Sequence, residues 1–282
     1  MPFTAAHPLA VLPLVRWHRR LGLDPTCLII GSMAPDFEYF VRGEQVSAIS
    51  HTLRGLWIWD LPATVMLAVL AHAVVKWPML LVAPAALTRR AVAVIGAPWR
   101  TRWGIAGLAS CAVSAVIGSA THVAWDSVTH AKGWGPRSFH ALRTPVQLPL
   151  IGAVAAHRAL QHASTAVGLA VLIVVIVRWS RRAPPIALPD LPRAAARALV
   201  AACSLAGVGL MAARLVARHT IDAGDLVVGG ISGLLAGTLI ASAILFGRGR
   251  ELARAWAGSA RPGGLRRDRE VKDPGAAGRL RQ

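Results

Sequence analysis

The sequence predicts an all-α, polytopic membrane protein: a bundle of about five transmembrane helices with short interfacial helices at its N-terminal end. The chain of 282 residues is 55% hydrophobic and only 16% charged, with a mean hydropathy of +0.51. A typical soluble domain carries about 25% charged residues. Five apolar stretches also approach the roughly 20 residues that cross a bilayer as a helix, namely residues 56–82, 104–123, 154–177, 194–213 and 226–246.

Tryptophan side chains mark the ends of several of these stretches. Trp57 and Trp59 open the first, Trp103 and Trp125 flank the second, and Trp179 follows the third. Because tryptophan gathers at the membrane–water interface, this placement favours spans over the buried helices of a large soluble protein. The fourth stretch is the weakest, since arginines crowd both of its ends.

Four regions follow from these spans. Residues 1–55 form an N-terminal helical region, in which residues 5–20 resemble a short amphipathic helix. Residues 21–33 are apolar but too short to span, so we expect them to lie in the interface or to pack over the bundle. Residues 56–180 hold the first three spans, residues 181–247 the last two, and residues 248–282 a basic, disordered tail. No cleavable signal peptide is expected.

The formal net charge of +18 is concentrated in places that suit a membrane surface. Ten of the 31 basic residues follow Phe246, so the tail is expected to touch anionic lipid headgroups. Without interleaved aromatic residues or a recognition helix, no nucleic-acid partner is expected. Basic residues in 83–103, 178–193 and the tail predict a cytoplasmic side, which puts residues 1–55 and 124–153 on the opposite side. Four basic residues in the N-terminal region argue somewhat against that export, namely Arg16, Arg19, Arg20 and Arg42.

The segment His122-x-x-x-Asp126-x-x-x-His130 is the most informative motif. Residues four apart lie on one helix face, about 6 Å apart along the axis, so His122 and Asp126 can hold one cation together. His130 would lie about 12 Å from His122 on an ideal helix. Either His130 serves a second ion, or the helix ends before it, as Gly133 and Pro136 allow.

Further candidate ligands are scattered along the chain but share one predicted side of the membrane. Imidazole and carboxylate ligands suit a divalent metal, zinc first and manganese second. Thiolates are not expected as ligands, because Cys27, Cys111 and Cys203 occur singly. The alternative is that these are ordinary polar residues at helix ends. The predicted metal ligands are His7, Asp36, His51, His122, Asp126, His130 and His162.

Several segments carry a resemblance to a known family. Residues 1–14, 31–40, 50–56, 122–134 and 160–165 resemble the bacterial integral membrane family DUF4184, over about residues 1–180. More remotely, the order Pro-Asp, His-Thr, His-x-x-x-Asp-x-x-x-His is similar to membrane-bound metal-dependent hydrolases and to zinc-dependent phospholipase C-like proteins. Asp126 departs from that pattern, in which glutamate is usual. The resemblance implies an integral protein of the bacterial cell membrane, and the distribution of basic residues predicts that the tail is cytoplasmic.

Two functions are consistent with these motifs. The first is a metal-dependent hydrolase of a phosphodiester, such as that of a lipid, in which Asp36 and Asp126 are catalytic and Arg54 holds the phosphate. The second is a non-catalytic transporter or scaffold whose His/Asp cluster is structural. An open metal position with bound water would distinguish them.

Overall fold

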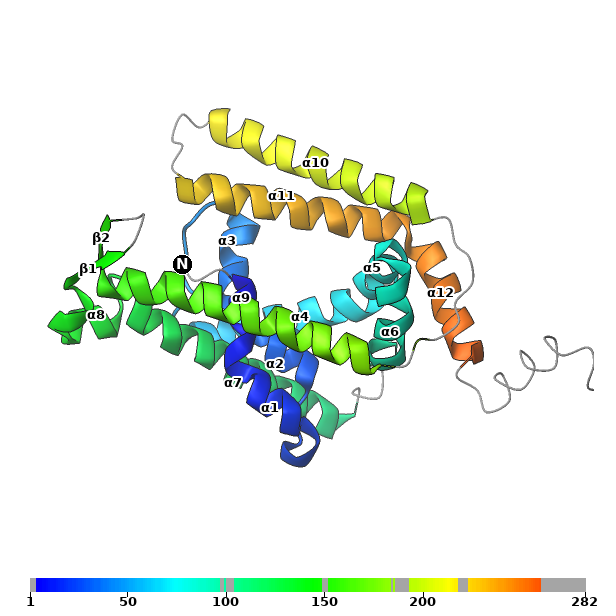
Figure 1. The fold of residues 1–282 in the computed structure, drawn as a ribbon, viewed down its shortest axis with the longest axis horizontal. Helices are drawn as coiled ribbons and strands as arrows, with labels where there is room; N and C mark the ends of the chain where they lie inside the picture. Colours follow the sequence, from blue (N-terminus) through cyan, green and yellow to red (C-terminus); the bar gives the residue numbers. More distant parts are fainter. Residues whose placement is uncertain are drawn as a thin grey trace, which may run out of the picture.

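Five helices are long and apolar enough to cross a membrane, as the sequence predicts. We used a computed structural model, which describes residues 4–96, 99, 104–148, 152–183, 185, 193–217 and 223–259. The long helices run in roughly similar directions along the molecule (Figure 1). The candidate spans are Leu56–Val82, Ile105–Ser138, Ala156–Arg182, Arg193–Ala217 and Gly224–Ile244.

The first span contains two π-helical segments. It runs through η3 (Leu56–Asp60), α4 (Leu61–Leu70), η4 (Ala71–Val75) and α5 (Lys76–Val82). Pro62 and Pro78 lie just after the two π segments. Proline lacks an N–H and clashes with the carbonyl four residues earlier, so a locally widened helix accommodates each proline.

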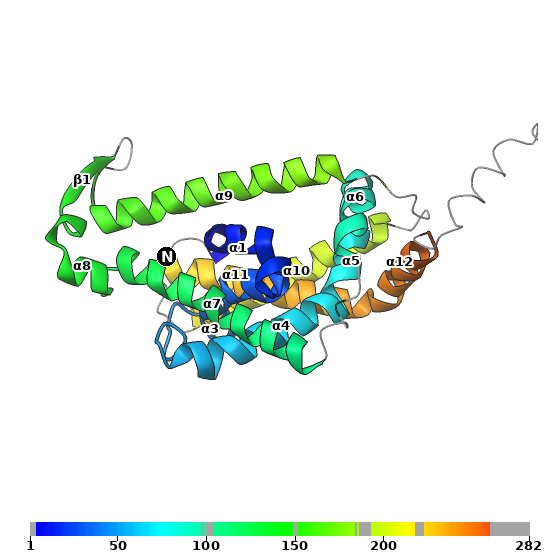
Figure 2. The same cartoon turned by 90° about the horizontal axis from the view of Figure 1, so that it is seen from below.

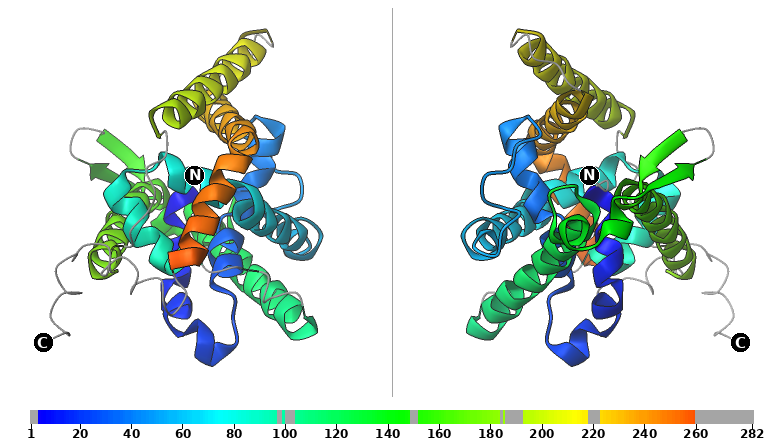
Figure 3. Two further views of the ribbon diagram at one scale, coloured as in Figure 1. Left: turned by 90° about the vertical axis from the view of Figure 1, so that its right-hand side faces the viewer. Right: turned by 90° about the vertical axis from the view of Figure 1, so that its left-hand side faces the viewer.

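The elements that follow the first span complete the bundle and add a small β-hairpin. They are α6 (Ala85–Ile95), α7 (Ile105–Thr129), α8 (Trp134–Ser138), η6 (His140–Leu142), β1 (Pro145–Leu148), β2 (Gly152–Ala155), α9 (Ala156–Arg182), α10 (Arg193–Ala217), α11 (Ala223–Ile244) and α12 (Phe246–Ser259). The strands pair antiparallel, from Pro145 opposite Ala155 to Leu148 opposite Gly152. Viewed end-on, α10 and α11 form a pair on one side of the bundle (Figure 3). Gly207 and Gly233 meet backbone to backbone between them, which allows this close approach.

The N-terminal region begins with η1 (Thr4–Ala6), and then α1 (Pro8–Leu21) and α2 (Pro25–Gly31) form a helical hairpin beside α7. Gly22 turns the chain in the left-handed region, at φ 66°. Its carbonyl accepts a hydrogen bond from the Ser110 hydroxyl, near the start of α7. At the other end of α2, the Ser119 hydroxyl donates to the Gly31 carbonyl. Gly31 and Gly118 let the two backbones touch, so α2 packs on the bundle, one of the two positions expected for this segment.

The α1–α2 hairpin places the basic residues near its turn at the end of the bundle where α7 begins. Arg16, Arg19 and Arg20 lie in the last turns of α1 and are exposed. The same end carries α6, where Arg90 donates to the Ser180 carbonyl at the end of α9. We call this the basic end. The hairpin therefore returns these three arginines to the basic end.

The C-terminal segment is more ordered than predicted. Residues 248–259 were expected to be disordered, but they belong to α12. Leu252 is fully buried and packs with Leu80, Leu81 and Val92, and Trp256 contacts Trp77 with ring centroids 6.0 Å apart. Apolar residues four apart give α12 an apolar face that packs on α5. The high arginine content of the segment made this pattern hard to recognise in the sequence. Residues 260–282, the rest of the predicted tail, lie outside the described residues.

Candidate metal centre

Helix α7 presents His122 and Asp126 on one buried face near its end. His122 is fully buried and Asp126 is 5% exposed. The helix ends at Thr129, and His130 adopts an extended backbone conformation (φ −100°, ψ 139°). Its ring therefore turns back, with Nδ1 3.1 Å from the Asp126 carbonyl oxygen and 3.6 Å from Asp126 Oδ2. Of the two alternatives for His130, the structure shows the helix ending before it.

Asp36 reaches the same place from the far end of α2. It ends η2 (Ala34–Asp36), directly before α3 (Phe37–Arg42), and its side chain is fully buried. The Thr4 hydroxyl donates to Asp36 Oδ2 at 2.6 Å. Only Oδ1 therefore faces the histidines without a hydrogen-bond partner.

Glu38 organises the segment that delivers His51. Although Glu38 is only 1% exposed, its carboxylate accepts hydrogen bonds from the backbone N–H groups of Ala48, Ile49 and Ser50. Arg42 completes the set with a 2.7 Å ion pair. The sequence analysis missed this role, although an acidic residue between Phe37 and Tyr39 was a usable signal.

Four ligand-type atoms converge, and the four distances between a histidine nitrogen and a carboxylate oxygen are nearly equal. His51 Nε2 lies 3.5 Å from Asp36 Oδ1 and 3.4 Å from Asp126 Oδ2. His122 Nε2 lies 3.4 Å from each of the same two oxygens. All four atoms lie within 4.8 Å of one another. We call these four residues the His/Asp cluster.

The other ring nitrogen of His122 fixes which atom faces the cluster. His122 Nδ1 lies 2.8 Å from the Ser32 carbonyl oxygen, which can only accept, so Nδ1 carries the proton. In the neutral ring, Nε2 then presents a lone pair to two carboxylates. Seven buried atoms at the centre have no hydrogen-bond partner, which is a costly arrangement without a bound cation or proton. They are His7 Nε2, Asp36 Oδ1, His51 Nε2, His122 Nε2, Asp126 Oδ1, Asp126 Oδ2 and His130 Nε2.

His7 flanks the cluster, whereas two other predicted residues do not reach it. The His7 ring stacks on His122 at a centroid distance of 3.7 Å, and its Nε2 lies 3.8 Å from Asp126 Oδ1. The side chains of His162 and Arg54 are exposed, and neither contacts the cluster within the described part of the chain. Beside His162, it is Gln161 that is buried. The ligand role of His162 and the phosphate role of Arg54 stay predictions.

The charges of the centre shift the pKa values of the residues that lie outside the spans. Burial and the neighbouring His122 imidazole lower the pKa of His7 to about 4, so His7 is neutral at pH 7. Burial alone would raise the pKa of Asp36, but His122, His51 and Thr4 outweigh it and hold that pKa below its usual range. Burial opposes the charged form of His51, yet Asp126 and Asp36 raise its pKa.

A cavity of about 610 Å³ adjoins the cluster. Its lining includes Tyr39, His51, Asp126, His130, Lys132 and Trp134. Two ligand-type side chains of the cluster therefore border open space. A second buried carboxylate, Asp60 in η3, has no hydrogen-bond partner on either oxygen, and η3 packs against η2 and α7. Sequence analysis gave Asp60 no role.

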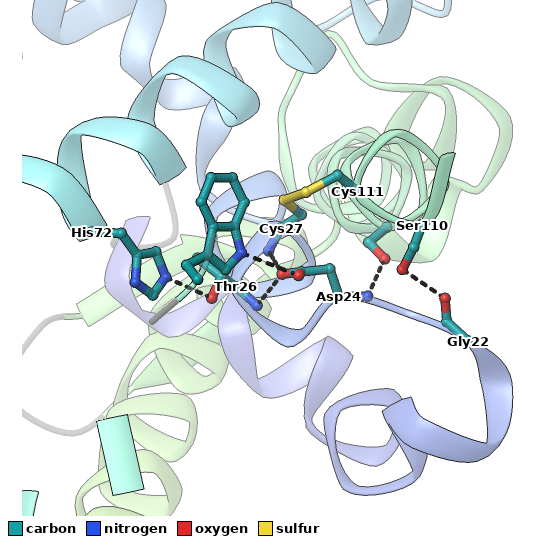
Figure 4. The surroundings of a disulfide bond; sticks show 9 residues. Gly22, Asp24, Thr26, Cys27, His72, Ser110 and Cys111 are labelled. Atoms are coloured by element: carbon teal, nitrogen blue, oxygen red, sulfur yellow. Dashed lines mark hydrogen bonds between the residues drawn. A yellow bond between two sulfur atoms is a disulfide. The ribbon is translucent and has the colours of Figure 1, made fainter. Parts of the chain in front are cut away.

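A disulfide between Cys27 and Cys111 joins α2 to α7 (Figure 4). The single occurrence of each cysteine along the sequence did not predict this bond, because a separation of 84 residues gives no local spacing signal. Asp24 lies beside them, and its Oδ1 accepts from the N–H groups of Thr26 and Cys27. Trp99 Nε1 donates to the other oxygen. Cys203 is free.

One of three comparisons with known proteins finds a match. A family model described as "Domain of unknown function (DUF4184)" matches residues 1–243. The chain belongs to the DUF4184 family. The match covers the whole His/Asp cluster and extends through α10 into α11, beyond the 1–180 expected from the motifs. No curated protein and no solved structure matches the chain. The match therefore assigns the chain to a family and leaves the reaction to the chemistry of the site.

Proposed function

We propose that this DUF4184 protein binds one divalent cation, zinc in the first place, at Asp36, His51, His122 and Asp126. The spacing of the four ligand atoms is the observation that supports this most. Zinc bonds of about 2.0–2.1 Å in a tetrahedron separate the ligand atoms by roughly 3.3–3.4 Å. The four His–Asp distances of 3.4–3.5 Å match that separation.

An ion pair without metal fits the geometry less well. Charge-assisted N–H···O bonds close to about 2.7–2.9 Å, which is shorter than each of the four distances at the centre. Two carboxylates and two neutral imidazoles carry a charge of −2, which a divalent cation cancels. That balance matters because an uncompensated charge inside a membrane bundle is costly.

We further propose that the centre hydrolyses a phosphodiester, the ester of a lipid being the favoured substrate. For this reaction the cation would have to take a water in addition to the four side chains, and it would then lower the pKa of that water and polarise the phosphoryl group. Support comes from the cavity beside His51 and Asp126, where a substrate group could approach. The remote similarity of the motif order to zinc-dependent phospholipase C-like proteins supports the same reaction class.

The residues around the cation divide the remaining tasks. Thr4 occupies Asp36 Oδ2, whereas Asp126 Oδ1 has no hydrogen-bond partner. Asp126 is therefore the better candidate to accept a proton from the attacking water. His130 lines the cavity with a buried, unpartnered Nε2. Because its Nδ1 faces the Asp126 carbonyl oxygen, the neutral ring presents a lone pair at Nε2 and is placed as a second proton acceptor. Lys132, rather than Arg54, lines the cavity and offers a cation for the phosphate.

The orientation in the membrane follows from the two ends of the bundle. We propose that the basic end faces the cytoplasm and that the His/Asp cluster opens on the other side, because exposed arginines gather at the end where α7 begins. A substrate would then meet the cluster at the non-cytoplasmic membrane surface.

The hydrolase proposal is tested by phosphodiester turnover in mixed micelles. Purified protein with added zinc or manganese should hydrolyse a lipid phosphodiester, and a chelator should abolish the reaction. Asp126→Asn should lower turnover by at least about 100-fold, because the substitution removes a metal ligand and a proton acceptor at the same time. Glu251→Gln, an exposed carboxylate on α12, is the matched control and should not change turnover. A protein that holds zinc but hydrolyses no phosphodiester would support the non-catalytic alternative.

A further inference from the structure

A second cavity, which is apolar, adjoins the His/Asp cluster through His7. Its volume is about 430 Å³, and it is bounded by three elements. Leu9 and Ala10 of α1 form one wall, Ala124 and Trp125 of α7 another, and Val167 of α9 the third. Figure 2 shows α1 lying between α7 and α9. We call this space the α1/α7/α9 groove.

The groove leads directly to the cluster. His7 lines the groove with one part of its ring and stacks on the cluster ligand His122. On α7, Trp125 borders the groove while the next residue, Asp126, borders the 610 Å³ cavity. The cluster therefore borders both an apolar space and a more polar one. An amphiphilic molecule could place its apolar part in the first and its polar part in the second.

The walls of the groove belong to helices that face the bilayer. Helices α7 and α9 are candidate membrane spans. Ala10, Ala124 and Val167 are exposed at the mouth of the groove. Across it, Trp125 Nε1 donates to the Ser164 hydroxyl at 3.3 Å. This bridge between α7 and α9 leaves too little width for a helix of about 10 Å diameter, whereas an extended hydrocarbon chain is narrower.

We infer that the α1/α7/α9 groove holds an acyl chain of a membrane lipid, whose headgroup reaches the His/Asp cluster past His7. The inference rests on the proposed function for the role of the headgroup. It names the substrate class as a membrane lipid that enters the groove laterally from the bilayer. His7 lies at the junction between chain and headgroup. Its ring lines the apolar groove and stacks on the cluster ligand His122.

Photolabelling by lipid tests the occupant. The protein is reconstituted in vesicles of phosphatidylethanolamine and phosphatidylglycerol that contain a phospholipid with a diazirine in its acyl chain. We expect labels to concentrate at Leu9, Ala10 and Trp125. Ile173 and Ile176, which are exposed on α9 outside the groove lining, report background contact with the bilayer.

A matched pair of substitutions separates the groove from the general surface. Ala124→Phe fills the groove, and labelling of Leu9 and Ala10 should fall roughly tenfold, as a loss of about 1.4 kcal/mol in binding predicts. Ala166→Phe adds the same side chain to an exposed position of α9 that does not line the groove, and labelling should not change.

The outcomes separate this inference from the proposed function. Equal labelling of Leu9 and Ile173 in the wild-type protein, or labelling that Ala124→Phe leaves unchanged, would overturn the inference. The wild-type distribution decides the matter even if Ala124→Phe does not fold. Zinc content is measured on the same samples, so loss of the metal proposal would be seen independently of the labelling pattern.

Discussion

Two buried polar groups lie along the same contact between α2 and α7, and they differ in how their polar atoms are partnered. At the basic end, Asp24, Cys27 and Cys111 lie together; about 16 Å further along α7 is the His/Asp cluster. Both sets are rich in possible metal ligands. Asp24 has hydrogen bonds to both carboxylate oxygens, and the two sulfur atoms are bonded to each other. At the His/Asp cluster, the converging atoms have no such partners.

The difference is the reason why we treat the group around Asp24 as structural and propose a metal at the His/Asp cluster. Buried polar atoms normally have hydrogen-bond partners, so the group around Asp24 needs nothing further. The His/Asp cluster instead holds its ligand atoms at fixed positions through outer contacts, such as Ser32 to His122 and Thr4 to Asp36. Such outer contacts orient metal ligands in known metal sites. The comparison therefore predicts that changes at the two groups have different consequences.

The largest expected effect is a complete difference in labelling from outside the cell between the basic end and the end that carries the His/Asp cluster. In a Cys203→Ser background, single cysteines at Arg19, Arg90 and Arg137 are tested with a membrane-impermeant maleimide on intact cells. Arg137→Cys should react, whereas Arg19→Cys and Arg90→Cys should react only after permeabilisation. Reaction of Arg19→Cys together with Arg137→Cys would show that the α1–α2 hairpin does not reach the basic end.

Loss of the disulfide should weaken the fold without emptying the metal centre. Replacing both Cys27 and Cys111 by serine opens a cross-link over 84 residues. We expect the free energy of unfolding to fall by about 2–4 kcal/mol, measured by denaturant unfolding in detergent. Zinc content at saturating metal should stay unchanged. A variant that loses its zinc while remaining folded would mean that the two groups are not independent.

Glu38→Gln should act in the opposite way, on metal affinity more than on the fold. The neutral amide cannot accept as strongly from Arg42 and the 48–50 backbone, so His51 is held less firmly. Outer residues of metal sites typically contribute about 10–100-fold in affinity, and we expect a loss in that range by competition with a chelating dye. Glu251→Gln is the control. If Glu38→Gln binds zinc like the control, Glu38 does not position His51.

The smallest expected effect belongs to Thr4. Thr4→Val removes one hydrogen bond to Asp36 Oδ2 and keeps the shape of the side chain. A hydrogen bond to a charged group contributes about 1.5–3 kcal/mol, part of which water can replace, so we expect zinc affinity to fall roughly tenfold. An unchanged affinity would assign the positioning of Asp36 to the backbone alone.

The fold was predictable because it depends on local patterns. Five apolar stretches and their tryptophan ends predicted the spans, and the four-residue spacing placed His122 and Asp126 on one face. The partners of α7 were not predictable in the same way. The Cys27–Cys111 bond and the support of His51 by Glu38 depend on tertiary contacts that no spacing in the sequence reveals. His162 does not contact the cluster because α9 buries the side chain of Gln161 and leaves that of His162 exposed.

The metal content of the purified protein tests the central claim most directly. After purification in detergent without chelators, elemental analysis of the wild-type protein should give one zinc per chain, with metal–ligand distances of about 2.0–2.1 Å by X-ray absorption. His122→Ala should lose the ion and remain folded, with the Cys27–Cys111 disulfide intact. A folded wild-type protein that holds no stoichiometric divalent metal, even after addition of zinc or manganese, would contradict the account.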